Sequence, residues 1–226
     1  MNISVIIPVL CEQNQINGTI SHLRSLEPDV EIIVVDGDPD GSTIAVITDP
    51  KVIPLTSAIK GRGNQLAAGT AAASGDILLM LHADTLLSEN AFNSILTSID
   101  QGAGWGAFRL GIAATSWPYR VLERFVDLRC KLFTLPYGDQ AIFVGRSALL
   151  QIGGVPAIPL MEDVELARRL RQTGFRFALL PERVSTSPRR WQKDGIIHRT
   201  LNNWILLLRY LWGTDPVKLA EQYRGN

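Results

Sequence analysis

The stretch ISVIIPVL at residues 3–10 is followed along the chain by EIIVVD at 31–36, KVIPLT at 51–56 and DILLML at 76–81. Short runs of Ile, Val and Leu without polar alternation are typical of strands that are covered on both faces. Helix-like segments alternate with these runs, at 13–25, 41–48, 61–74 and 88–101. Strands and helices in this order predict an α/β fold, a mainly parallel central sheet flanked by helices.

The pattern changes after residue 102. A glycine-rich, aromatic segment at 102–111 predicts an edge strand with bends. Further on we expect helices at 117–134 and 162–172, short strands at 141–146 and 175–180, and a C-terminal helical tail at 195–226. No linker, repeat or low-complexity tract interrupts the chain. We therefore expect a single domain, residues 1–226, divided into segments 1–101, 102–194 and 195–226.

Composition excludes several classes of protein. With 46% hydrophobic and 19% charged residues the chain is not disordered, and 22 basic against 22 acidic residues disfavour a nucleic-acid binder. The two cysteines, Cys11 and Cys130, lack the spacing of a disulfide scaffold or zinc knuckle and suit a reducing compartment. The N-terminus does not resemble a leader, and no run reaches the ~20 apolar residues of a membrane span. We expect a cytoplasmic protein, at most peripheral to a membrane.

Residues that are mostly polar follow each of the first four predicted strands. They are Glu12 after the first, Asp36 and Asp38 after the second, Arg62 after the third, and His82, Ala83 and Asp84 after the fourth. The carboxyl ends of parallel strands meet at one edge of a sheet, where ligands bind. Carboxylates there can hold a divalent cation that binds a diphosphate, and an arginine near a helix start favours an anion. Each group taken alone also has a structural explanation, since Asp and Gly after strands are ordinary turn formers.

Asp84 is the strongest candidate metal ligand of this group. His82 would project to the same side of an extended chain. Histidine ligates Mn or Zn but is a poor ligand for Mg, so a packed or hydrogen-bonded His82 is the alternative.

Two adjacent carboxylates, Glu162 and Asp163, begin a predicted helix in the second half. Acidic residues in a first turn complement the helix dipole, which is the simple explanation. The apolar pair Leu160-Met161 before them would also partly desolvate a carboxylate and raise its pKa towards that of a general base. Both interpretations stay open at this point.

Basic residues gather in two places of the second half. Arg168, Arg169 and Arg171 are expected on a solvated helix face. A stretch containing Pro188, with Arg189, Arg190, Trp191 and Lys193, is expected to be non-helical. It is either a mobile loop that closes over a diphosphate leaving group or a surface loop with incidental charge.

Six elements in order resemble family 2 glycosyltransferases of the GT-A fold, over roughly residues 3 to 195. They are Ile6-Ile7-Pro8-Val9-Leu10 with Glu12, Val34-Val35-Asp36-Gly37 with Asp40-Gly41-Ser42-Thr43, Arg62-Gly63, His82-Ala83-Asp84, Glu162-Asp163 and Arg189-Arg190-Trp191. The segments Gly138-Asp139-Gln140 and Gly153-Gly154 are similar to those of a small bacterial subgroup of that family.

The resemblance implies an inverting transfer of a sugar from a nucleotide-diphosphate sugar to an acceptor hydroxyl. It implies donor binding by segment 1–101 and acceptor binding and catalysis by segment 102–194. Donor contacts would come from Pro8, Glu12, Asp36, Asp38, Arg62, His82, Ala83, Arg190 and Trp191, with Ser187 in place of the family's leading glutamine. Asp84 matches the last acid of the DxD motif and would bind Mn or Mg, with His82 in place of the first acid. Asp163 matches the catalytic base, with Glu162 beside it, and the acceptor side would include Gly138, Asp139 and Gln140.

Other functions are less consistent with the sequence. A Rossmann dehydrogenase needs a GxGxxG turn after its first strand, where this chain has PVLCE. A sugar-phosphate nucleotidylyltransferase would carry a glycine- and arginine-rich loop there. A nucleotide-sugar sensor without catalysis remains an alternative. The acceptor, a small molecule or a lipid-linked one, is not defined by the sequence.

The C-terminal tail has an apolar helical face. Its members are Ile197, Leu201, Trp204, Ile205, Leu208, Leu211 and Trp212. Asn202 and Arg209 lie on the other side. We expect this face to pack on its own domain or on a second copy of the chain, and contact with a membrane is the alternative.

Overall fold

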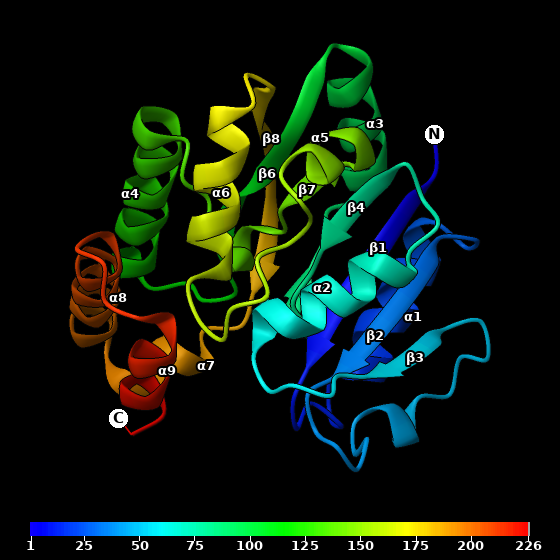
Figure 1. Ribbon diagram of the computed structural model, residues 1–226, viewed down its shortest axis with the longest axis horizontal. Coiled ribbons are helices and arrows are strands. Elements are labelled where there is room, and N and C mark those ends of the chain that lie inside the picture. The colour runs from blue at the N-terminus through cyan, green and yellow to red at the C-terminus, as the bar shows by residue number, and fades with distance from the viewer. Residues whose placement is uncertain (226) are drawn as a thin grey trace.

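The computed structural model describes residues 1–225, apart from the side chains of residues 190, 224 and 225. The strands are β1 Ile3–Val9, β2 Glu31–Asp36, β3 Ile53–Thr56, β4 Ile77–Met80, β5 Thr85–Leu86, β6 Ala103–Ile112, β7 Phe143–Gly145 and β8 Arg176–Thr186. The helices are α1 Ile16–Leu26, α2 Arg62–Ala72, α3 Ala91–Asp100, α4 Trp117–Phe133, α5 Arg146–Gln151, α6 Glu162–Gln172, α7 Arg189–Asp194, α8 Ile196–Leu211 and α9 Pro216–Gly225. Two 3₁₀ turns, η1 Ile44–Val46 and η2 Gly138–Gln140, complete the elements (Figure 1).

One eight-stranded sheet runs through the molecule in the order β3-β2-β1-β4-β7-β6-β8-β5. Strands β1 to β4 are parallel to one another, as the spacing of the first half predicts. Strand β7 is antiparallel to both β4 and β6, and β6 pairs in parallel with β8. The predicted α/β fold with flanking helices is confirmed, and its sheet is mixed in the second half.

Strand β6 lies inside the sheet, so the prediction of an edge strand at 102–111 is wrong. Its glycines reflect close contacts with neighbouring strands. A Cβ at Gly106 would lie 2.2 Å from the carbonyl oxygen of Ala178, and one at Gly111 would lie 2.4 Å from that of Val184. The glycines therefore allow β8 to approach β6 closely.

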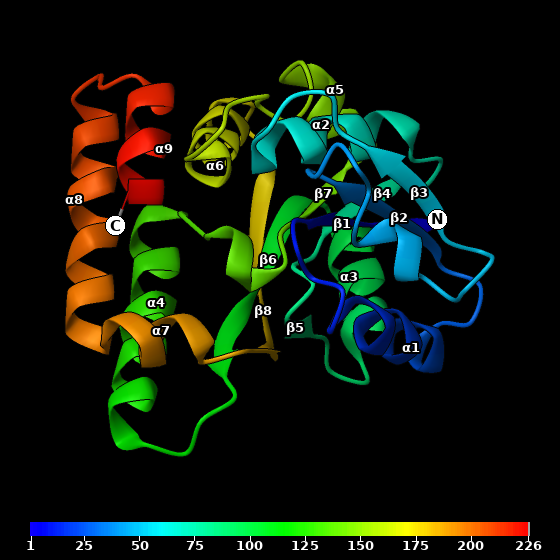
Figure 2. The ribbon, with the colours of Figure 1, turned by 90° about the horizontal axis from the view of Figure 1, so that it is seen from below.

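Helices cover both faces of the sheet (Figure 2). One hydrophobic cluster joins Val5, Ile7 and other strand residues to α1, α3 and α4. A second cluster, which contains Ile6 and Ile33, joins the opposite face to α2, α5 and α6. Burial on both faces explains why β1, β2 and β4 are continuous apolar runs. The same prediction is wrong for β3, which lies at the edge of the sheet and is largely exposed.

Two local predictions need correction. The segment at 41–48 contains only the turn η1, because Asp36 and Gly41 hold this stretch in a loop. The stretch after Pro188 was expected to be non-helical, but it forms the short helix α7, which Pro188 precedes at the N-cap. Proline is compatible with a helix start because it donates no hydrogen bond there.

The C-terminal helices pack at one side of the sheet, next to α4 and α6 (Figure 2). Leu207 of α8 and Leu219 of α9 are buried against Met161 and Val164. The predicted apolar face of α8, which we call the α8 stripe, is exposed instead, from 44% at Leu208 to 82% at Trp212. The expectation that it packs on its own domain is therefore wrong, because a different face of α8 makes that contact. No helix within residues 1–225 is long and apolar enough to cross a membrane.

Candidate active site

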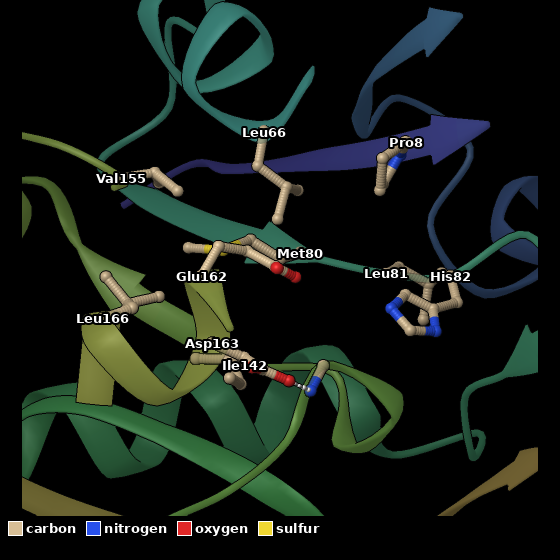
Figure 3. Close-up of a pocket in the computed structure, with 11 residues that line it drawn as sticks. Pro8, Leu66, Met80, Leu81, His82, Ile142, Val155, Glu162, Asp163 and Leu166 are labelled. Atoms are coloured by element: carbon tan, nitrogen blue, oxygen red, sulfur yellow. Dashed lines mark hydrogen bonds between the residues drawn. The ribbon is translucent and has the colours of Figure 1, made fainter. Parts of the chain in front are cut away.

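A cavity of about 820 Å³ opens at the carboxyl ends of β1 and β4. Ten of the predicted site residues line it: Pro8, Glu12, Arg62, His82, Ala83, Asp84, Gly138, Asp139, Asp163 and Trp191. A small, mostly apolar recess shares Pro8, His82, Gly138 and Asp163 with this cavity and is also lined by Glu162 (Figure 3). The side chain of Arg190 lies outside the described residues. The fold thus brings most of the predicted residues to one place.

Asp163 stands in the first turn of α6, which begins after Met161 in a left-handed backbone conformation. Its Oδ2 accepts a hydrogen bond of 2.8 Å from the backbone N–H of Gly138, drawn as a dashed line in Figure 3. Its Oδ1 accepts one of 2.8 Å from the N–H of Val164. The side chain is 12% exposed. Asp163 is therefore an oriented carboxylate at the cavity wall.

Glu162 is buried and forms an ion pair with Arg62 at the start of α2. The Nε of Arg62 donates to Oε1 of Glu162, and its Nη2 lies 3.7 Å from Oδ2 of Asp163. Burial raises the pKa of Glu162, although Arg62 opposes this effect. Burial also disfavours a charged Arg62, but the two carboxylates outweigh it and raise its pKa. We expected the apolar pair Leu160-Met161 to desolvate one of the two adjacent carboxylates. The carboxylate that burial desolvates is that of Glu162.

The glycines around Arg62 serve packing. A Cβ at Gly63 would lie 2.3 Å from the carbonyl oxygen of Ile158, and one at Gly61 would lie 2.7 Å from Cα of Pro159. These contacts seat the start of α2 on the segment before α6. The close contacts therefore give these glycines a structural reason.

His82 lies beside Arg62, with its Nε2 3.4 Å from Nη1 of the arginine. A Cβ at Gly138 would lie 2.9 Å from the same Nε2, so a larger residue there would have to displace the imidazole. Gly138 thereby contacts both the imidazole and, through its N–H, Asp163. The structure supports the packed and hydrogen-bonded alternative for His82.

Asp84 is mostly buried, with 10% of its side chain exposed. Nη2 of Arg189, from α7, lies 3.8 Å from its Oδ2 and 3.2 Å from Oε1 of Glu12. Within residues 1–225, no three His, Cys, Asp or Glu side chains gather in a way that would hold a metal ion by themselves. Asp84 thus offers one carboxylate to a cation, next to a guanidinium.

Three predicted binding residues do not line the cavity. Asp36 is fully buried, and its carboxylate accepts hydrogen bonds from the N–H groups of Asp38, Thr43 and Ile44 at 2.9, 2.8 and 3.3 Å. Asp38 belongs to the loop that Asp36 shapes. Gln140 is also fully buried, where its Oε1 accepts from Arg129 at 2.8 Å. Asp36 and Gln140 therefore act by holding neighbouring loops in place.

Sequence reasoning missed several cavity residues. Arg199 of α8 and Tyr223 of α9 line the outer part, where the Arg199 guanidinium lies 5.0 Å from the Tyr223 ring centroid. Arg199 also pairs with Asp194 at 3.1 Å. Neither belongs to a motif, so only the tertiary packing of the tail reveals them. Arg189 lies in a quoted motif but had not been selected as a site residue.

Comparisons with known proteins identify the family. The model of glycosyl transferase family 2 matches residues 4–150. A probable glycosyltransferase of Bacillus subtilis (strain 168), YdaM, is 25% identical over 223 residues, with 84% of this chain and 52% of that protein covered. The chain therefore spans about half the length of this curated relative.

Solved structures show the same fold at low sequence identity. A mannosyltransferase from Pyrobaculum calidifontis, in complex with GDP-Man and Mn²⁺, has a TM-score of 0.65 at 18% identity, covering 81% of this chain and 56% of that one. Glucosyl-3-phosphoglycerate synthase from Mycobacterium tuberculosis, with Mn²⁺, UDP and phosphoglyceric acid, has the same TM-score and identity and covers 94% and 78%. S. aureus TarS 1-349 with UDP-GlcNAc has a TM-score of 0.63 at 14% identity and covers 83% and 58%. The family model matches well over half of this chain, and the chain has a GT-A fold. The chain therefore belongs to the enzymes of glycosyl transferase family 2.

Proposed function

We propose that the chain moves a sugar from a nucleotide-diphosphate sugar to an acceptor hydroxyl with inversion at the anomeric carbon. The observation that carries this proposal is that Asp84, after β4, and Asp163, at the start of α6, line one cavity although they come from different halves of the chain. Its volume of about 820 Å³ is within the range of small-molecule sites. Membership of family 2 favours glycosyl transfer over the nucleotidyl transfer that the sequence had left open.

The donor is proposed to lie over the ends of β1 and β4. Pro8, Glu12 and Ala83 line this part of the cavity, and Asp36 supports it by holding the loop after β2. Trp191 lines the cavity from α7, and Arg190 has the family position near the diphosphate. The solved neighbours were captured with GDP-Man, UDP-GlcNAc or UDP, which supports a nucleotide-diphosphate donor here.

The residues present fit a divalent cation held jointly by Asp84 and the donor. Mg²⁺ is commonly bound through one or two carboxylates plus substrate phosphates, and a single carboxylate is what this site offers. Neighbours that contain Mn²⁺ or Mg²⁺ support the same assignment. Such a cation supplies positive charge where the departing diphosphate becomes more negative. Arg189 provides a guanidinium beside the same carboxylate.

Asp163 is proposed as the general base. Its carboxylate takes the proton of the acceptor hydroxyl while the acceptor oxygen forms a bond to the anomeric carbon. The bond from that carbon to the diphosphate oxygen breaks, and the nucleoside diphosphate leaves with the electron pair. Hydrogen bonds from Gly138 and Val164 orient the carboxylate, and the Glu162–Arg62 ion pair fixes the turn that carries it.

The acceptor is proposed to enter on the side of η2 and the tail. Gly138 and Asp139 line this side of the cavity, opposite residues of α7, α8 and α9. Gln140 supports η2 from within the core through its contacts with Arg129 and Phe108. A small molecule and a lipid-linked acceptor both remain compatible with this arrangement.

A binding and turnover panel tests the proposal. Nucleoside diphosphates and their sugars are titrated by calorimetry with and without Mn²⁺, and any donor that binds is then followed for hydrolysis or transfer. We expect one nucleotide-sugar to bind with Mn²⁺-dependent affinity and to be slowly hydrolysed without acceptor. Binding of a donor without hydrolysis or transfer would identify a sensor instead, and the absence of binding across the panel would contradict both.

A further inference from the structure

Exposed apolar side chains gather on α4 and α8. Of the 21 large hydrophobic side chains exposed in the part of the chain that the structure describes, 13 lie on these two helices or at Trp212 directly after α8. The exposed set of α4 comprises Trp117, Val121, Phe125, Leu128, Leu132 and Phe133. The first five of these recur at intervals of three or four residues, so they form one stripe along the helix, the α4 stripe.

The side chains of both stripes are exposed to solvent. On its other side α4 buries Tyr119, Val126 and Cys130 in the core, and α8 buries Leu207. Figures 1 and 2 both place α4 and α8 at the same side of the protein, far from β3 and α1. We call the two stripes together the α4–α8 face. Exposed apolar surfaces of this extent mark interaction sites in soluble proteins.

The charges next to these stripes are mostly basic. Helix α4 carries four Lys or Arg residues against two acidic ones, whereas the whole chain is balanced at 22 against 22. Arg120 pairs with Glu123 at 3.0 Å and Arg129 donates to Gln140 at 2.8 Å, so among the described residues the basic ones of α4 without such partners are Arg124 and Lys131. The acidic residues of α4 are withdrawn, because Glu123 is buried and Asp127 pairs with Arg183 at 2.7 Å. Arg124 and Lys131 are exposed beside the α4 stripe. This arrangement complements a negatively charged surface.

We propose that the α4–α8 face binds the surface of an anionic lipid bilayer. Amphipathic helices with basic flanks lie in the interface with their apolar side inserted, and each Lys or Arg near anionic lipid strengthens the attraction. Three of the five tryptophans, Trp117, Trp204 and Trp212, are exposed on this face, by 75%, 46% and 82%. Tryptophan is enriched at membrane interfaces. The inference concerns location and goes beyond the proposed reaction.

A second copy of the chain fits this face less well. A twofold dimer places the same patch of both copies together, so Arg124 and Lys131 of one copy would approach the basic residues of the other. Charge therefore favours lipid over the dimer that the sequence suggested.

Vesicle sedimentation of the full chain tests the proposal. We expect the protein to pellet with vesicles of phosphatidylcholine and phosphatidylglycerol, and much less with phosphatidylcholine alone, with a blue shift of tryptophan emission on binding. Leu201→Ser with Leu208→Ser should weaken partitioning by about tenfold or more, because apolar area is lost from the inserted face. Arg124→Glu with Lys131→Glu should do the same on anionic vesicles only.

Matched variants control for a general effect of surface substitution. Ile53→Ser with Leu150→Ser replaces exposed apolar residues elsewhere, and Lys51→Glu with Arg176→Glu reverses two distant charges. Both pairs should pellet like the unaltered chain, and all variants should melt at similar temperatures. The proposal is overturned if the unaltered chain stays in solution with anionic vesicles, or if the controls lose binding equally. A dimer that the Leu201/Leu208 pair converts to a monomer would instead identify an interface between copies.

Discussion

The two halves of the molecule position their site residues in different ways. In the first half, Glu12, His82 and Asp84 follow the ends of parallel strands, so the sheet itself brings them together. In the second half, Asp163 stands at a helix start and is placed by contacts with Gly138 and Arg62. The first arrangement follows from topology, whereas the second depends on tertiary contacts.

The halves also differ in how they are buried. Residues of β1, β2 and β4 are covered on both faces, and Ile6, Ile33 and Leu79 are 0% exposed. Helix α8 buries only Leu207 among its described side chains and leaves its stripe in contact with solvent. Stability should therefore reside mainly in the first half, and the tail should contribute to the cavity wall and to the α4–α8 face.

The largest expected effect separates the roles of the two halves. Asp163→Asn removes the proposed base and should lower turnover by about 10²–10⁴-fold, the usual contribution of general-base catalysis. Nucleotide affinity, which we propose that the first half provides, should stay nearly unchanged. Single-turnover kinetics and calorimetry measure the two quantities. Asp100→Asn, at the exposed end of α3, serves as the control.

Loss of turnover and of nucleotide affinity to the same degree would argue against this division. It would mean that the hydrogen bonds of Asp163 to Gly138 and Val164 hold the fold of the site and that the carboxylate has a structural role.

The contrast in burial predicts a contrast in stability. Ile33→Ala opens a cavity between the sheet and α2 and should lower the free energy of unfolding by about 2–5 kcal/mol. Leu208→Ala, on the α8 stripe, should change it by no more than about 0.5 kcal/mol. Urea denaturation measures both. A cost at Leu208 close to that at Ile33 would show that the stripe is covered in solution.

The difference between the halves explains what the sequence could reveal. The four parallel strands and the residues after them could be predicted, because β1, β2 and β4 are buried, continuous apolar runs, β3 alternates with them along the chain, and the strand ends converge. The internal position of β6 could not, because its glycines permit a close approach of β8 that only the folded partner explains. Arg199 and Tyr223 could not be found either, since they reach the cavity through the packing of the tail.

Single residues show the same limit. Asp36 was recognised as important from its place after β2, but a sequence does not tell a ligand contact from a loop support. Its three backbone hydrogen bonds show that it supports the loop after β2. Glu162 and Asp163 are adjacent in sequence, yet only the position of Arg62 shows which of the two is buried in an ion pair.

A smaller effect is expected where the tail meets α6. Glu165 of α6 accepts hydrogen bonds from Arg168 and Arg169 and from the hydroxyl of Tyr210 on α8, the last at 2.6 Å. The hydrogen bond from Arg168 is the main reason why the pKa of Glu165 falls from 4.5 to about 2. Burial of the carboxylate acts in the opposite direction, and the hydrogen bond from Tyr210 lowers the pKa further. A lowered pKa stabilises the fold above the unfolded value, and this stabilisation is lost as pH falls from about 4.5 to about 2.

Glu165→Gln should therefore cost about 2 kcal/mol at neutral pH, the scale of hydrogen bonds to a charged group. The gap to the unaltered chain should close as the pH is lowered through that window. Thermal unfolding across pH measures it, with Glu89→Gln, an exposed loop residue, as the control. A gap that is constant with pH would show that the charge of Glu165 is unimportant for holding α8.

The smallest predicted effect concerns Asp84, on the donor side of the cavity. Its substitution should change nucleotide binding, whereas that of Asp163 should change turnover. Asp84→Asn should weaken Mn²⁺-dependent binding of the nucleoside diphosphate by about tenfold, equal to roughly 1.4 kcal/mol. The effect is modest because the phosphates supply other ligands and Arg189 keeps positive charge beside the site. Binding without Mn²⁺ should change little. Since Arg189 also pairs with Glu12, loss of the Asp84 carboxylate leaves the guanidinium in place. Equal weakening with and without Mn²⁺ would mean that Asp84 positions Arg189 and does not bind the cation.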